Sequence, residues 1–258
     1  MQGVYISGNP QGPAVVLLHS SMSSARQWRE LAGQLEQDFY ILNIDLLGYG
    51  QAPKVSQTGA FSLATESERI RQHLHELGVT RFHLVGHSFG GAIALKLAYE
   101  LKPMVMSLAV FEPVAFHLLD KQHPGFLEVQ ALGNEVSQLS AEQAAARFVN
   151  YWNGSGYFSA MPQQVQQGFI KQVEKVRLDF VGLMGEPYGL NDYAKICCPV
   201  LLLSGRDTRD SAKAVAQSLC SALPHLTYQQ VSGGHMAPIS HSAEVNTHLF
   251  AFLASQLQ

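Results

Sequence analysis

Charge is scarce in this sequence of 258 residues, and no stretch of it concentrates charge of one sign. Charged residues make up 14% of the chain, and the formal net charge is −3. Proteins that bind nucleic acid carry a basic patch or stripe, so we expect no nucleic-acid partner. The chain also lacks an apolar run of the roughly 20 residues that cross a bilayer, so we expect no membrane partner.

Cysteine is equally sparse. The three cysteines, Cys197, Cys198 and Cys220, cannot all pair with one another, and two of them are adjacent. The first residues also lack the basic and apolar segments of a secretory signal peptide. We therefore expect reduced thiols in the core of a cytoplasmic protein. Neither the cysteines nor the histidines occur at metal-ligand spacing, so no metal and no organic cofactor is expected.

Apolar residues, by contrast, make up 47% of the chain and gather in short segments. Seven segments have the length and composition of strands, most of them buried on both faces. They cover residues 4–7, 14–18, 40–44, 81–85, 106–111, 199–204 and 226–231. Helical patterns lie at about 24–37, 63–77, 89–101, 211–220 and 243–257. This alternation predicts an α/β fold with a mostly parallel central sheet and helices on both faces.

The alternation breaks between residues 113 and 196, where helical patterns and loops occur without a convincing strand. We expect this insertion to form a helical lid over the site, with residues 1–112 and 197–258 as the core. The low charged fraction also favours some apolar surface, either in a small-molecule pocket or in a homodimer contact.

The most informative stretch is HLVGHSFGG, residues 83–91. Apolar residues lead into Gly86-x-Ser88-x-Gly90, and a run of small and apolar residues follows, so the pattern predicts a strand, a sharp turn and a helix. Glycines flank the turn because a side chain there would collide with neighbouring backbone. This context is that of a nucleophile elbow, which presents the serine hydroxyl at the positive end of a helix.

Four landmarks together resemble the α/β-hydrolase fold family. They are Leu17-Leu18-His19, Asp45-x-x-Gly48-x-Gly50, Gly86-x-Ser88-x-Gly90 and Gly233-Gly234-His235. The resemblance implies that Ser88 is the nucleophile, that His235 is the general base, and that the backbone N–H groups of Phe89 and Ser21 form the oxyanion hole. Residue 20 is serine where the family usually has glycine, which leaves an N–H donor in place.

A catalytic serine and histidine also need a carboxylate to orient the imidazole. In the commoner family position the acid falls three residues after a glycine in the turn that follows residues 200–204. Thr208 stands there, with Asp207 one position early. The other position follows residues 106–111 and holds Glu112, as in haloalkane dehalogenase-like members of the family. We favour Glu112 and keep Asp207 as the alternative.

These residues predict a serine hydrolase that cleaves a small-molecule carboxylic ester through an acyl-enzyme. Carbon–carbon bond hydrolysis of the meta-cleavage type, a non-hydrolytic lyase and a small-ligand binding protein are the alternatives on the same fold. Dehalogenation and epoxide hydrolysis are not expected, because both need an aspartate at the position of Ser88. Within the insertion, Tyr151, Trp152 and His117 are candidates to line the substrate pocket, or else to pack the lid on the core.

Overall fold

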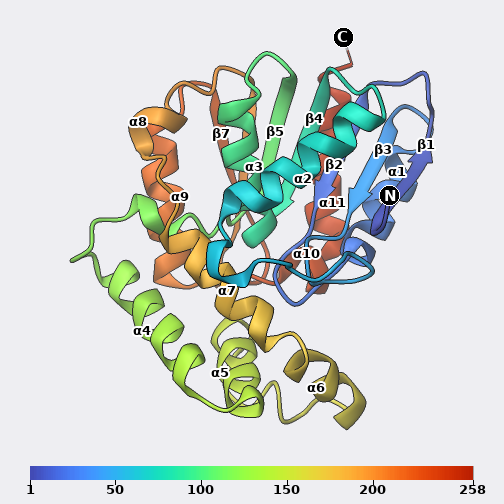
Figure 1. Ribbon diagram of the computed structural model, residues 1–258. Coiled ribbons are helices and arrows are strands. Elements are labelled where there is room, and N and C mark those ends of the chain that lie inside the picture. The colour runs from blue at the N-terminus through green and yellow to red at the C-terminus, as the bar shows by residue number, and fades with distance from the viewer. Residues whose placement is uncertain (258) are drawn as a thin grey trace.

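The computed structural model describes residues 1–257. Its centre is a seven-stranded sheet (Figure 1). The strands are β1 (Val4–Gly8), β2 (Ala14–Leu18), β3 (Tyr40–Ile44), β4 (Phe82–His87), β5 (Val105–Phe111), β6 (Val200–Gly205) and β7 (Leu226–Val231). Their order is β1-β3-β2-β4-β5-β6-β7, and every pair is parallel except β1 with β3. All seven predicted strands are present within about two residues of their expected bounds, so the predicted fold class is confirmed.

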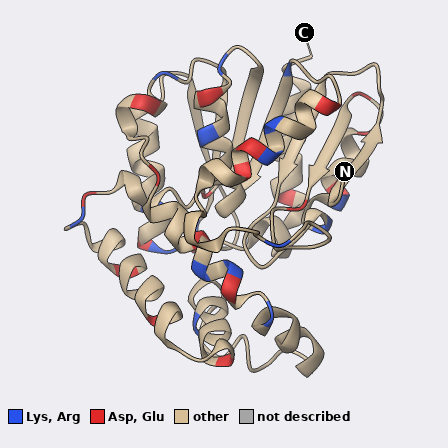
Figure 2. Ribbon diagram, in the orientation of Figure 1, with Lys and Arg blue, Asp and Glu red and all other residues tan. Residues whose placement is uncertain are grey.

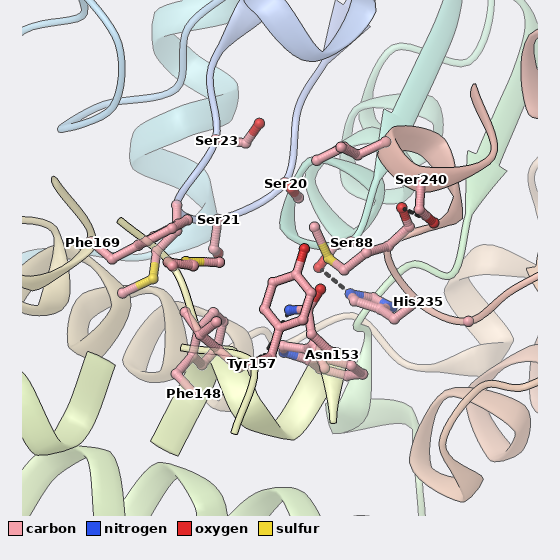
Figure 3. Close-up of a pocket in the computed structure, with 17 residues that line it drawn as sticks. Ser20, Ser21, Ser23, Ser88, Phe148, Asn153, Tyr157, Phe169, His235 and Ser240 are labelled. Atoms are coloured by element: carbon pink, nitrogen blue, oxygen red, sulfur yellow. Dashed lines mark hydrogen bonds between the residues drawn. The ribbon is translucent and has the colours of Figure 1, made fainter. Parts of the chain in front are cut away.

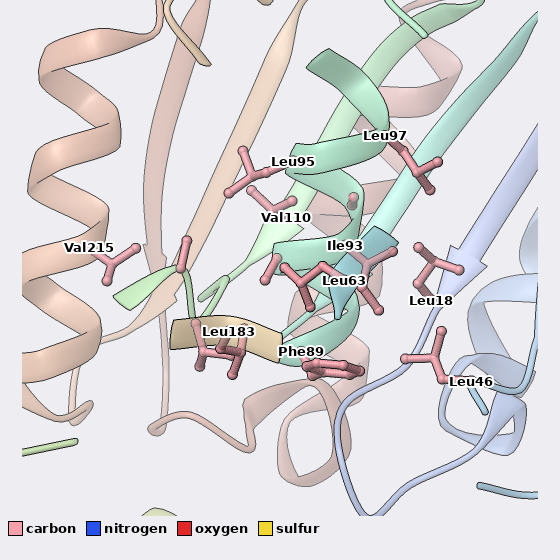
Figure 4. Packing of buried hydrophobic residues seen from close by; sticks show 14 of the residues in the cluster. Leu18, Leu46, Leu63, Phe89, Ile93, Leu95, Leu97, Val110, Leu183 and Val215 are labelled. Atoms are coloured by element: carbon pink, nitrogen blue, oxygen red, sulfur yellow. The ribbon is translucent and has the colours of Figure 1, made fainter. Parts of the chain in front are cut away.

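Helices cover both faces of the sheet, which is why its inner strands are apolar without interruption. On one face lie α2 (Leu63–Glu76), α3 (Phe89–Glu100) and α9 (Asp210–Ala222), and on the other lie α1 (Arg29–Leu35) and α11 (Ser242–Ala254). Along β2, Val16 and Leu18 pack toward the first face, whereas Val15 and Leu17 pack toward the second. Figure 4 shows how side chains of α3 meet those of the strands beneath it.

Residues 113–196 contain helices joined by loops and no strand, within the part of the chain that the structure describes. These are η3 (Phe116–Leu118), α4 (Pro124–Gln138), α5 (Ala141–Asn153), α6 (Gln163–Ile170), α7 (Val173–Met184) and α8 (Leu190–Tyr193). In Figure 1, α4, α5 and α6 extend away from the end of the sheet, and α7 lies between them and α3. The sequence starts these helices with recognisable signals, such as the capping box of Ser140 with Gln143 and a proline at the start of α4.

The cysteines are free, as predicted, but their predicted burial is wrong. Cys197 and Cys220 are exposed and Cys198 is half-buried. Cys220 follows the buried Leu219 on α9, and a one-residue step of about 100° around a helix turns its side chain to the outer face.

The charged residues are spread over the described part of the chain. Figure 2 shows Lys and Arg interspersed with Asp and Glu on the sheet domain and on the helical insertion alike. Within residues 1–257, no helix has both the length and the apolar character that a membrane span requires.

Candidate active site

Ser88 occupies a sharp turn between β4 and α3. Its backbone has φ 55° and ψ −117°, a conformation that residues other than glycine rarely adopt. The turn is possible only because glycines stand two residues before and two residues after Ser88. A Cβ at Gly86 would lie 2.5 Å from the Gly90 carbonyl oxygen, and a Cβ at Gly90 would lie 2.4 Å from the His19 carbonyl oxygen. The predicted elbow geometry is therefore present, and it presents the Ser88 hydroxyl at the N-terminus of α3.

Three side chains from distant parts of the chain are hydrogen-bonded in series at this turn. His235, in the loop between β7 and α10 (Ala237–Ser240), has its Nε2 2.9 Å from Ser88 Oγ. Its Nδ1 lies 2.7 Å from Oε2 of Glu112, which follows β5 directly. All three residues are buried. Because a carboxylate only accepts hydrogen bonds, the arrangement favours the tautomer with the proton on Nδ1 and leaves Nε2 free to accept one from Ser88.

Glu112 is held in place by donors from the last residue of β6 and from the turn that follows it. The Gly205 N–H donates to Oε1 at 2.8 Å, and the Thr208 hydroxyl donates to Oε2 at 2.7 Å. Glu112 itself has φ 39°, so the chain makes a tight turn as it leaves the strand. In the commoner family pattern, an acid stands three residues after the glycine of this turn. Here that residue is Thr208, which instead hydrogen-bonds to Glu112, the acid at the other position. Sequence reasoning missed this role of Thr208.

The alternative acid, Asp207, lies apart from this series. Asp207 is exposed, and its carboxylate makes no hydrogen bond within residues 1–257. Its backbone N–H donates to the Gly233 carbonyl at 2.9 Å, which fixes the turn rather than the imidazole. Of the two carboxylates that the sequence left open, the structure brings Glu112 to His235.

The two predicted oxyanion donors come from the start of α3 and from the loop after β2. Phe89 is the first residue of α3, so its N–H has no partner within the helix. Ser21 lies in the loop after β2, and this loop is fixed by His19, whose Nδ1 donates to the Ser20 carbonyl at 2.7 Å and whose Nε2 accepts from the Leu46 N–H at 2.9 Å. Burial lowers the pKa of His19 to about 4, so its imidazole is neutral at pH 7 and can make both bonds.

A buried charged cluster connects this loop to helix α7. Asp179 Oδ2 accepts hydrogen bonds from the Ser21 hydroxyl at 2.6 Å and from the Tyr49 hydroxyl at 2.5 Å. Lys175 pairs with Asp179 and also with Glu66, at 3.2 Å. Burial raises the pKa of Asp179, although Lys175 opposes that shift. Sequence reasoning missed this cluster, whose one local signal is a lysine four residues before an aspartate on a helix.

Ser88 and His235 open into a cavity of about 350 Å³ (Figure 3). Residues of α5, of α6 and of the segment between them form one side, and the Ser20–Ser23 loop and residues around α10 form the other. Trp152, a predicted lining residue, stacks on His235 with ring centroids 3.7 Å apart. The structure therefore places Trp152 against both the cavity and the imidazole.

The other two predicted lining residues lie elsewhere. Tyr151 does not line the Ser88 cavity, and its hydroxyl is 2.8 Å from the Ser211 hydroxyl. His117 borders a separate hollow between η3, α4 and α7, where its ring meets Tyr193 edge-on. Tyr151 and Trp152 are neighbours on one helix, so their side chains point in directions about 100° apart and only one of them reaches the cavity.

Comparison with known proteins agrees with this fold. A model of the alpha/beta hydrolase family matches residues 15–248. An uncharacterized protein of Mycobacterium tuberculosis is 34% identical over 94 residues, so the match covers 36% of this chain and only 27% of that protein. A putative carbamate hydrolase of Yersinia enterocolitica is 25% identical over 250 residues, with 95% of this chain and 88% of that protein covered. The enol-lactonase of Burkholderia xenovorans superposes with a TM-score of 0.81 at 17% identity, over 98% of this chain and 96% of that one.

Proposed function

Because this chain belongs to the alpha/beta hydrolase family, we propose that it hydrolyses carboxylic esters of small molecules through a covalent acyl-enzyme. The hydrogen bonds that join Ser88 to His235 and His235 to Glu112 carry this proposal. Serine is a weak nucleophile at neutral pH and needs a base within hydrogen-bond reach, and the base needs a fixed tautomer. Ser88 and His235 meet both requirements, and both line a largely apolar cavity.

In the first half of the reaction, Ser88 Oγ attacks the ester carbonyl carbon while His235 Nε2 takes the hydroxyl proton. Glu112 keeps the second ring proton on Nδ1 and offsets the charge of the imidazolium. The backbone N–H groups of Phe89 and Ser21 donate to the carbonyl oxygen as it becomes negative, with the N-terminal end of α3 adding a favourable field. His235 then gives its proton to the leaving alcohol, and an acyl-Ser88 ester remains.

In the second half, His235 Nε2 takes a proton from a water molecule, whose oxygen attacks the acyl-Ser88 carbonyl carbon. The same two N–H groups hold the second oxyanion. Collapse of this intermediate breaks the bond to Ser88 Oγ, which recovers its proton from His235. The products are the carboxylic acid and the unmodified enzyme.

We also propose that residues 113–196 act as a cap over the site, with residues 1–112 and 197–258 as the hydrolase core. Phe148 and Trp152 of α5 and Phe169 of α6 all line the cavity that contains Ser88. Trp152 also covers one face of His235. A cap of this kind excludes bulk water from the oxyanion and surrounds the apolar part of the ester.

The test pairs a fluorophosphonate probe with a panel of chromogenic esters, applied to the wild type, Ser88→Ala and the exposed control Ser221→Ala. Both labelling and turnover should disappear in Ser88→Ala and persist in Ser221→Ala. Labelling without turnover of any ester would instead favour carbon–carbon bond hydrolysis or lyase chemistry. Wild-type protein that does not label would contradict an activated serine and favour a binding protein.

A further inference from the structure

The space around Ser88 has two compartments of very different size. The first is the cavity of about 350 Å³ already described, and the second is a pocket of about 20 Å³. Ser21, Ser88, Phe148 and Trp152 line both of them, so the two compartments meet at the Ser88 hydroxyl. An ester bound for attack at Ser88 extends in two directions from its carbonyl carbon, and each half has one compartment available.

The small pocket is walled mainly by apolar side chains, and Asp179 is the one charged residue in its lining. Val114 and Phe116 come from the segment after β5, and Val176, Phe180 and Leu183 come from α7. A space of about 20 Å³ accommodates roughly one water-sized group. Val114, Phe116, Val176 and Leu183 belong to the main hydrophobic core, and Asp179 is held in the wall by its ion pair with Lys175. The pocket therefore has little freedom to enlarge around a long chain.

The direction of proton transfer decides which half of the ester enters which compartment. The leaving alcohol oxygen must take its proton from His235 Nε2, so the alcohol lies on the His235 side of the carbonyl carbon. Gly234, His235, Met236 and Ile239 line the large cavity, and none of the four lines the small pocket. The alcohol therefore occupies the large cavity, and the acyl chain occupies the small pocket.

We propose that the substrates are esters of a very short acyl group, acetyl above all, with a bulky and largely apolar alcohol. This inference rests on the proposed ester hydrolysis and adds the substrate class to it. The large cavity is of the size that holds a ring system, and its apolar lining includes Phe148, Met161, Phe169 and Ile239. The small pocket accepts a methyl group and excludes an acyl chain of four or more carbons.

The experiment measures kcat/KM for two ester series. The first keeps 1-naphthol as the alcohol and lengthens the acyl group from acetate through butyrate to octanoate. The second keeps acetate and enlarges the alcohol from methanol through benzyl alcohol to 1-naphthalenemethanol, so that every leaving group is an alkanol. We expect 1-naphthyl acetate to exceed 1-naphthyl octanoate by at least about 100-fold, and 1-naphthylmethyl acetate to exceed methyl acetate.

Variants then separate the two compartments. Leu183→Ala should enlarge the small pocket and shift the preference toward butyrate, by about fourfold for each methylene that gains apolar contact. Val176→Ala tests the same wall with a smaller change, in case the first variant does not fold. Ile239→Ala, in the large cavity, is the matched control. It should leave the acyl preference unchanged and reduce the discrimination between 1-naphthylmethyl and methyl acetates.

Two results would overturn the inference alone. One is wild-type enzyme that labels with the fluorophosphonate and prefers butyrate or octanoate to acetate. The other is an acyl preference that stays unchanged in folded Leu183→Ala and Val176→Ala enzymes. Absence of both labelling and turnover with every ester would instead overturn the proposed function, and this inference with it.

Discussion

Replacing Glu112 by glutamine tests the candidate active site at the point where the sequence left two alternatives. In this variant, the side-chain carbonyl oxygen could still accept the Gly205 N–H that now donates to Oε1 at 2.8 Å. The new NH₂ group would then face His235 Nδ1, which lies 2.7 Å from Oε2 in the wild type. An NH₂ group only donates, so Nδ1 has to accept and the ring proton moves to Nε2.

The expected loss follows from that change of tautomer. With its proton on Nε2, His235 donates to Ser88 and can no longer remove the hydroxyl proton. A comparable amide substitution in a serine protease lowers kcat by about 10⁴ through the same cause. We expect kcat of Glu112→Gln to fall by about 10³ to 10⁴, which corresponds to about 4–5.5 kcal/mol in activation free energy. Because the amide has nearly the volume of the carboxylate, the fold should be retained.

The assay compares steady-state ester hydrolysis and the fluorophosphonate labelling rate in the wild type, Glu112→Gln and Asp207→Asn. Circular dichroism and a urea melt establish that each variant is folded. Asp207→Asn is the matched control, since its exposed carboxylate makes no hydrogen bond within residues 1–257, and its kcat should stay within about twofold of the wild type. If folded Glu112→Gln keeps more than a tenth of wild-type kcat while Asp207→Asn loses most of it, the assignment is wrong.

Three further variants test other parts of the structure. Gly90→Ala would place a Cβ 2.4 Å from the His19 carbonyl oxygen, so a urea melt should show a loss of about 2–3 kcal/mol. Burial lowers the pKa of His117 to about 4, so protonation favours the unfolded chain as pH falls from about 6.5. When the pH is lowered from 7.5 to 4.5, the free energy of unfolding should fall in the wild type by about 2–3 kcal/mol more than in His117→Phe. Asp179→Asn weakens the support of Ser21, and kinetics should show kcat about tenfold lower, or about 1.4 kcal/mol, with KM little changed.

The strands and the elbow could be predicted because their causes are local in the sequence. A strand buried on both faces needs an uninterrupted apolar run, and Ala14–Leu18 is one. The turn at Ser88 needs small neighbours, and glycines stand at both of the positions where backbone approaches within about 2.5 Å. These requirements constrain adjacent residues, so they are visible without knowledge of the fold.

The sequence favoured Glu112 as the acid but left Asp207 as an alternative, because the groups that hold the acid are distant from it in the chain. Gly205 and Thr208, which hold the Glu112 carboxylate, lie 93 and 96 positions after it. Spacing alone therefore placed Asp207 close to the commoner acid position and predicted no role for Thr208. Glu112 also lies in a tight turn with φ 39°, which directs its side chain, and no pattern in the sequence predicts this conformation. Such a choice depends on how β5 and β6 pair, which is a property of the folded sheet.

Helix α7 connects the proposed selectivity to the proposed chemistry. One side of it supplies Val176 and Leu183 to the wall of the small pocket. Asp179, on the same helix, accepts the hydrogen bond of Ser21, whose backbone N–H is a proposed oxyanion donor. A substitution that moves α7 therefore alters both the size of acyl group that fits and the position of that N–H. Selectivity and turnover should consequently change together in variants of α7, whereas variants of α10, such as Ile239→Ala, should change alcohol selectivity alone.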